Sequence, residues 1–172
     1  MSIFLMSVAG FLLAAGLQTP PPEVPSALKV SAGEKLVFWA HATGSQIYVC
    51  QAGADQKFSW VLKGPEAELF DAKGLPIGHH SAGPMWKHND GSQVTGKMVA
   101  RQDASEPDAI PWLLLQATGH TGSGALSSVT TIQRVHTMGG QPPTISGCDQ
   151  SSQGKEVKSQ YSADYYFYAP GK

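Results

Sequence analysis

Short apolar runs, broken at close intervals by glycine- and proline-containing turns, constrain the fold of this chain more than any other feature. The 172 residues include 19 Gly and 12 Pro. After residue 17 no stretch keeps the 3.6-residue apolar period of an amphipathic helix. The pattern therefore predicts an all-β fold, a single-domain antiparallel β-sandwich or closed barrel of about nine short strands.

The strands are expected where aromatic, aliphatic and β-branched residues gather between turn signals. A Thr43-Gly44-Ser45 turn, a Lys73-Gly74 turn and the Asn89-Asp90-Gly91 hairpin turn separate several of them. Pro111 must sit near a strand start or on an edge, because it cannot donate to a sheet ladder. The expected strands cover residues 36–39, 46–51, 58–62, 67–71, 77–80, 85–87, 92–101, 110–117, 127–137 and 161–168.

The N-terminus is typical of a secretory signal peptide. Residues 3–17 are apolar and no charged side chain precedes Glu23. The segment is shorter than the ~20 residues that span a bilayer, and Ala14-Ala15-Gly16 fits a cleavage site after Gly16. We expect a signal peptide at residues 1–17, a Pro-rich segment at 18–27 and one all-β domain at 28–170, with no transmembrane segment after cleavage. A buried N-terminal helix is the alternative.

Export would place the two cysteines in an oxidising compartment, secreted or periplasmic. Cys50 lies in the strand-like run QIYVCQ, Cys148 lies in a loop, and neither has C-x-x-C spacing. An even cysteine count in such a compartment predicts a Cys50–Cys148 disulfide. Two free thiols are the alternative.

Charge and motifs exclude several function classes. The formal net charge is −1, the pI is about 6.6 and no basic run exists, which argues against a nucleic-acid partner. No G-x-S-x-G elbow is present, and the acidic residues near turns single out no catalytic pair. The sequence leaves open whether the protein is an enzyme.

The segment GHHSAGPMWKHNDGSQVTG, residues 78–96, holds the strongest candidates for chemistry. Imidazoles of His79, His80 and His88 would suit a zinc or copper ion. Neighbours in a strand point to opposite faces, so this segment offers two ligands at best. A third would come from elsewhere: His41, His120, His136, Asp71 or Asp90. The plainer interpretation is that these histidines form hydrogen bonds at strand ends.

The aromatic residues suggest a second kind of site. Trp86 adjoins a hairpin tip, so we expect it at a surface cleft where a ligand could stack. Trp39, Trp60 and Trp112 are expected in the core. Residues 118–124, which include His120, are expected to form a flexible connection.

Taken together, these motifs resemble one family. KLVFWAHATGSQIYVC, then FSWVLKGPEAELFDAKGLPIGHHSAGPMWKHNDGSQVTGK, AIPWLLLQATGHTGSGALSSVTTIQRVHTMGGQPPTISGC and YSADYYFY are similar to the Domain of Unknown Function 3455 family. The resemblance covers about residues 23–168 and implies a secreted all-β domain. It supplies no mechanism and no functional residues. The chain also lacks the G-x-G-x-x-G and βαβ pattern of a dinucleotide-binding fold.

Three functions remain open from the sequence. The first is an exported domain that binds a small molecule, glycan or protein, with Trp86, His79, His80 and His88 as candidate ligand-binding residues. The second is a zinc- or copper-dependent redox or hydrolytic protein that uses the same three histidines. The third is a secreted structural protein without a pocket. The sequence establishes no cofactor.

Overall fold

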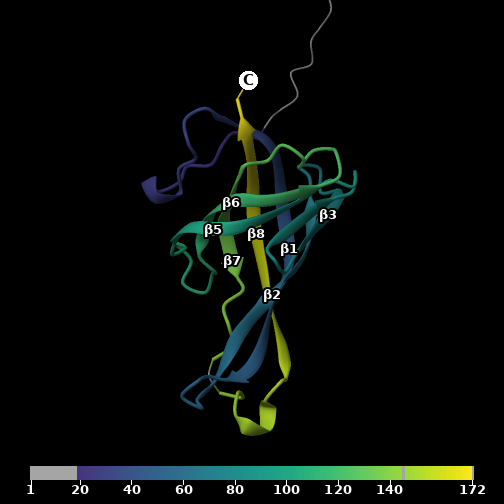
Figure 1. Cartoon of the computed structure of the whole chain (residues 1–172). Helices are drawn as coiled ribbons and strands as arrows, with labels where there is room; N and C mark the ends of the chain where they lie inside the picture. Colours follow the sequence, from purple (N-terminus) through teal and green to yellow (C-terminus); the bar gives the residue numbers. More distant parts are fainter. Residues whose placement is uncertain (1–18, 145, 172) are drawn as a thin grey trace, which may run out of the picture.

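The computed structural model describes residues 19–144 and 146–171, so the predicted signal peptide lies outside the described residues. Eight antiparallel strands each pair with the next in sequence, and the last pairs with the first, so the sheet closes into a barrel (Figure 1). This confirms the predicted all-β class. The strands are β1 (Glu34–Ala52), β2 (Phe58–Phe70), β3 (Pro76–Ser81), β4 (Met85–His88), β5 (Gln93–Gln102), β6 (Trp112–Thr121), β7 (Thr131–Gly139) and β8 (Glu156–Pro170). Two short 3-10 helices, η1 (Ser26–Leu28) and η2 (Gln150–Ser152), complete the elements.

Three strands continue past the barrel as an arm. β1, β2 and β8 contain 19, 13 and 15 residues, and their far ends form a twisted three-stranded extension (Figure 1). Tyr48 on β1 pairs with Leu62 on β2 and with Val157 on β8. Near the end of the arm Cys50 and Cys148 form the predicted disulfide, with a Cα–Cα distance of 5.3 Å.

The long strands correct the sequence prediction, which split each of β1 and β2 in two. Thr43-Gly44-Ser45 is extended strand, not a turn. Gly44 pairs with Ala67 so closely that a Cβ added to Gly44 would lie 2.6 Å from the Ala67 Cβ. Gly64 (φ +150°) lies at a register shift between β1 and β2, a β-bulge that bends β2 without ending it. The described residues therefore form eight strands, not nine.

Other predicted turns are confirmed. Lys73-Gly74 connects β2 to β3, where the Asp71 carboxylate accepts backbone N–H bonds from Lys73 and Leu75. The Asn89–Gly91 turn joins β4 to β5, whose register places Met85 opposite Thr95. Pro111 directly precedes the first residue of β6.

The segment at residues 118–124 is more ordered than predicted. Residues 118–121 belong to β6, and the His120 ring Nε2 lies 2.7 Å from the Val129 carbonyl oxygen. Asp90, in the β4–β5 turn, accepts a 2.8 Å hydrogen bond from the Ala125 backbone N–H. This hydrogen bond fixes the loop that contains Leu126, whose side chain is fully buried in the core.

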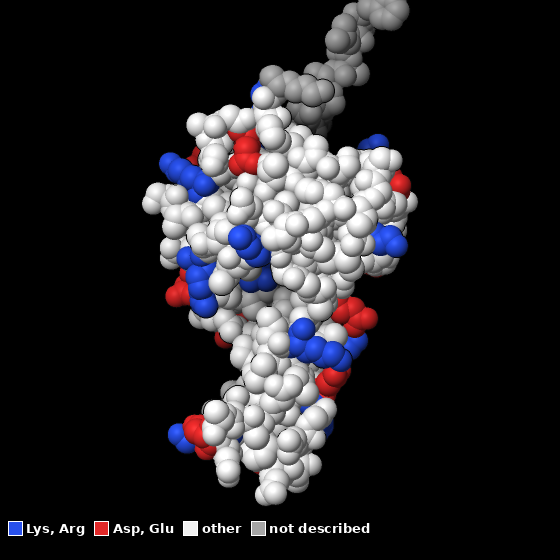
Figure 2. All heavy atoms as spheres, in the orientation of Figure 1, with Lys and Arg blue, Asp and Glu red and all other residues white. Residues whose placement is uncertain are grey.

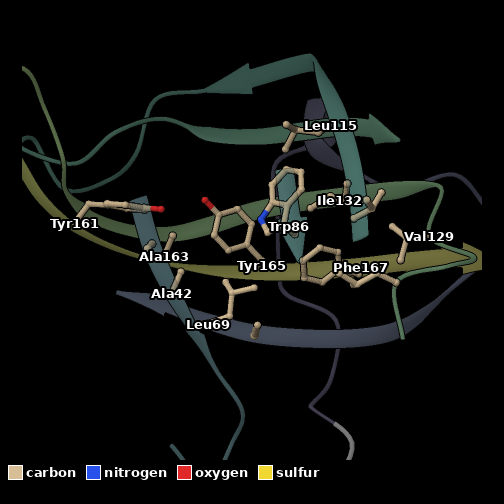
Figure 3. Close-up of a cluster of buried hydrophobic side chains, with 14 of the residues drawn as sticks. Ala42, Leu69, Trp86, Leu115, Val129, Ile132, Tyr161, Ala163, Tyr165 and Phe167 are labelled. Carbon is tan, nitrogen blue, oxygen red and sulfur yellow. The ribbon is translucent and has the colours of Figure 1, made fainter. Parts of the chain in front are cut away.

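Alternation along the strands places one face of each inside the barrel. The interior is apolar and aromatic (Figure 3). β1 contributes small residues, Ala40 and Ala42, and β8 contributes large ones, Tyr161, Tyr165 and Phe167. Burial of such side chains stabilises the fold by roughly 1.5–3 kcal/mol each.

A second apolar cluster lies outside the barrel wall. Val135, Tyr166 and Tyr168 pack there with partly buried Trp39, Trp112, Leu36, Val24 and Val30. Gln133 links the segment before β1 to the sheet. Its side-chain amide donates a 2.7 Å hydrogen bond to the Leu28 carbonyl and accepts one from the Tyr168 hydroxyl. No helix in residues 19–144 or 146–171 is long and apolar enough to cross a membrane.

Candidate ligand pocket at the barrel mouth

A cavity of about 400 Å³ opens where the arm leaves the barrel. Its rim includes residues 62–65 at the bulge of β2, and its depth reaches side chains of the barrel interior. Figure 2 shows both basic and acidic side chains around this waist, between the rounded barrel and the arm. We call it the mouth pocket. Its described lining residues are Gln46, Leu62, Lys63, Gly64, Pro65, His80, Gly83, Pro84, Trp86, Met98, Arg101, Pro111, Leu113, Leu115, Arg134 and Tyr165.

His80 and Trp86 form one wall of the mouth pocket. They face each other in the β3–β4 register, and their rings stack with centroids 4.5 Å apart. His80 is only 3% exposed, and its Nδ1 lies 2.9 Å from the Met85 carbonyl oxygen. Burial lowers the pKa of His80 to about 3, so the ring is neutral at pH 7. Because Nδ1 meets a carbonyl, the neutral ring carries its proton there and leaves Nε2 as an acceptor.

Two buried donors on residues that line this pocket have no hydrogen-bond partner among the described residues, the Trp86 indole Nε1 and the Gln46 amide Nε2. The hydroxyls of Tyr161 and Tyr165 interact with one another, and the Tyr165 hydroxyl also interacts with the Arg134 side chain. Figure 3 shows the two tyrosine hydroxyls pointing toward one another and the indole nitrogen of Trp86 facing Tyr165. Burial raises the pKa of both tyrosines, so they stay protonated. A buried donor without a partner costs about 1–3 kcal/mol.

Arg134 brings a positive charge to the same place. It pairs in register with Tyr165 on β8 and Leu113 on β6, so its side chain shares their inward face. Its Nε and Nη2 donate to the Pro111 carbonyl oxygen at 3.2 and 2.8 Å. The guanidinium acts on its neighbours, since its charge opposes the rise in the Tyr165 pKa and contributes to the fall in the His80 pKa.

A second cavity, of about 480 Å³, adjoins the first. Both are lined by Gln46, Leu62, Arg101, Pro111 and Arg134. The second cavity also includes two carboxylates, from Asp103 and Glu106. Of these two cavities only the mouth pocket is lined by His80, Trp86 and Tyr165, so the unpaired Trp86 indole marks it as the candidate site.

Residues 31–169 match the model of a family described as protein of unknown function (DUF3455). The chain belongs to the DUF3455 family. The match confirms the resemblance seen in the sequence and contains every residue of the mouth pocket. No curated protein and no solved structure matched the chain.

In this DUF3455 protein the three predicted histidines do not come together. His80 points into the barrel, whereas its neighbour His79 lies on the outer face beside a shallow hollow lined by Glu68. His88 packs edge-on against Phe38, with ring centroids 5.2 Å apart. Among the described residues no group of three or more His, Cys, Asp or Glu side chains could hold a metal ion.

Two of the histidines considered as further ligands share a carboxylate instead. His41 Nδ1 lies 2.8 Å from one Asp164 oxygen and His136 Nδ1 lies 2.9 Å from the other. This cluster is on the outside of β1, β7 and β8, whereas His80 lies inside the barrel. It therefore contributes nothing to the mouth pocket.

The tryptophan prediction was wrong in its assignment of core and surface. Trp86, expected at a surface cleft, is 1% exposed and belongs to the core cluster. Trp39, Trp60 and Trp112, expected in the core, are only partly buried. The β3–β4 register causes the difference, because it sets Trp86 opposite the inward His80. Trp86 still lines the pocket, but from the interior side.

Sequence reasoning missed Arg134, Gln46 and Tyr165. The signal for Arg134 was present in TIQRVHTMG, where alternation puts it on the same face as Ile132. A charge on the apolar face of a strand is uncommon unless it is paired or functional. Gln46 gave a similar signal, because it is a polar residue on the same face of its strand as Ala42 and Tyr48.

Proposed function

We propose that this DUF3455 protein is an exported binding domain that holds a small organic molecule in the mouth pocket. The ligand would enter between the rim of β2 and the barrel and place its polar end among Tyr165, Trp86 and Arg134. The remainder would lie against the apolar side chains of Leu113, Leu115 and Met98, which line the same cavity.

One observation carries this proposal: buried donors without a partner belong to residues that line a cavity. Native proteins satisfy the large majority of their buried polar groups. Trp86 Nε1 and Gln46 Nε2 both belong to pocket-lining residues and both lack a partner among the described residues. A ligand with oxygen acceptors would satisfy them. A volume of about 400 Å³ lies in the range typical of small-molecule sites.

The exported location rests on two supports. Residues 1–17 have the composition of a signal peptide. The Cys50–Cys148 disulfide is of a kind that forms and persists in oxidising compartments. We therefore place the ligand in the periplasm or outside the cell.

Binding of 1-anilinonaphthalene-8-sulfonate (ANS) tests the proposal, because this dye joins an acidic group to an apolar body and fluoresces when shielded from water. We expect saturable fluorescence enhancement with the oxidised protein. Leu113→Trp would fill the cavity and weaken ANS binding by about tenfold or more, equivalent to about 1.4 kcal/mol.

Leu114→Trp is the matched control, because Leu114 neighbours Leu113 but lines a separate hollow at η1. Met98→Trp provides a second blocking variant at an exposed part of the pocket, where a larger side chain is tolerated. Circular dichroism would verify that each variant is folded. Absence of saturable ANS binding, or equal binding by all three variants and the wild type, would overturn the proposal.

A further inference from the structure

We infer that the natural ligand of the mouth pocket is an organic carboxylate with a flat apolar body, anchored by Arg134. This inference rests on the proposed function and specifies the chemical class of the ligand. It follows from the sign of the charges around the pocket, the state of the Arg134 guanidinium and the shape of the apolar wall.

The charged side chains that line the pocket have one sign. Three cationic side chains line it, Lys63, Arg101 and Arg134, and none of the described lining residues is acidic. Two of these cations already have carboxylate partners outside the lining: Lys63 pairs with Glu156 at 2.6 Å and Arg101 with Asp103 at 3.1 Å. Both of those pairs are solvent-exposed, so they contribute little to binding in the interior.

Arg134 differs from the other two. None of the ion pairs between described residues involves it. Its bonds to the Pro111 carbonyl use Nε and one Nη2 hydrogen, and the guanidinium also interacts with the Tyr165 hydroxyl. Because a guanidinium has five N–H groups, some of them remain for a ligand. A partly buried cation without a counter-ion is unfavourable, and a carboxylate matches its planar donor geometry.

The surrounding donors suit the same group. A carboxylate is an acceptor only, with about four lone-pair sites. The Trp86 Nε1 and the Gln46 Nε2 are donors without partners on residues that line the same pocket as Arg134. A cationic or donor-rich ligand would leave these groups unpaired and would be repelled by Arg134. A carboxylate would accept hydrogen bonds from these donors and would also neutralise the charge of Arg134.

The other walls indicate the shape of the remainder of the ligand. The stacked rings of His80 and Trp86 have planes within 7° of each other, and Pro84, Leu113 and Leu115 continue the apolar lining. Flat rings pack well beside such side chains. The neutral His80 adds no charge that would compete with Arg134 for the carboxylate.

A matched pair of probes tests the inference on the full mature protein. Naphthalene-2-carboxylate and naphthalene-2-carboxamide have nearly the same size and shape but differ in charge. We expect the carboxylate to displace ANS at a concentration at least about tenfold lower than the carboxamide. In Arg134→Gln this preference should fall below about threefold, because the carboxylate should lose more affinity than the carboxamide, and Arg134→Lys should restore part of the preference.

Arg101→Gln is the control, because Arg101 lines the same pocket but is exposed and paired with Asp103. Its preference for the carboxylate should stay near the wild-type value. Equal binding of the two naphthalene probes by the wild type would overturn the carboxylate inference while leaving the pocket intact. If neither probe displaces ANS and ANS itself shows no saturable binding, the proposed function fails as well.

Discussion

The Cys50–Cys148 disulfide gives the most quantitative prediction about stability. It joins residues 98 positions apart and ties the end of β1 to the segment that leads into β8. In the chain-entropy model, closing a loop of about 100 residues removes enough freedom from the unfolded chain to stabilise the fold by about 4.7 kcal/mol. The link should therefore supply a substantial part of the stability of a domain this size, typically about 5–15 kcal/mol.

The perturbation is Cys50→Ala, Cys148→Ala and the double variant, each measured by thermal and urea unfolding. Each single variant should lose most of the 4.7 kcal/mol, since either one removes the cross-link. At ~2–4 °C per kcal/mol for a domain of this size, the melting temperature should fall by about 10–20 °C. The double variant should lose little more than one single variant, and dithiothreitol should lower the stability of the wild type by a similar amount.

Two results would refute this reasoning. If the double variant lost the sum of the two single losses, the cysteines would act independently and would not be partners. A loss below about 1 kcal/mol in each single variant would show that the cross-link does not restrict the unfolded chain as the loop length requires.

Three further predictions concern single residues. His80 has a pKa of about 3 in the folded protein and about 6.5 in the unfolded chain, so stability should fall as the pH drops below 6.5, by up to about 1.4 kcal/mol per pH unit from this residue. Urea unfolding between pH 7 and pH 4 should show a shallower decline in His80→Gln than in the wild type. An NMR titration that places the pKa of His80 near 6.5 in the folded protein would contradict this prediction. Gly44→Ala should destabilise the fold by about 1–3 kcal/mol through overpacking against Ala67, as measured by urea unfolding. Gly53→Ala is the control and should cost less, because the atom nearest to an added Cβ is 3.1 Å away. Equal losses in the two variants would refute the close approach of the paired strands at Gly44. Asp90→Ala removes the acceptor for the Ala125 N–H, so amide exchange at Ala125 and Leu126 should accelerate; unchanged exchange would show that the loop is held by other contacts.

Local patterns were sufficient to predict the fold class and several connections. Alternating residues predicted β-strands, the Asn89-Asp90-Gly91 turn marked a real hairpin, and the cysteine count, together with the predicted signal peptide, predicted the disulfide. The strand lengths were not predictable in this way. Gly44 and Gly64 resemble turn residues locally. Gly44 instead permits the close approach of two paired strands, and Gly64 lies at a bulge. Both features depend on a partner strand that the local sequence pattern does not identify.

The candidate site was only partly predictable. Residues 78–96, which the sequence singled out, include two residues that line the mouth pocket, His80 and Trp86. Their roles depend on the β3–β4 register, which turns both rings inward. Arg134 and Tyr165 come from strands late in the chain and meet the pocket only because β7 pairs with β8 and β8 lies in the closed barrel.

The most direct test of the central claim, that the mouth pocket binds a ligand, is an NMR titration of the indole N–H groups. The chain has four tryptophans, and Trp86→Phe would assign the signal of Trp86. On addition of naphthalene-2-carboxylate, the account predicts a saturable shift of the signal of Trp86, which lines the pocket and whose N–H has no partner among the described residues. Little change is expected at Trp39 or Trp60, which do not line the pocket. A Trp86 signal that stays in place up to millimolar probe, or shifts equally at all tryptophans, would contradict the account.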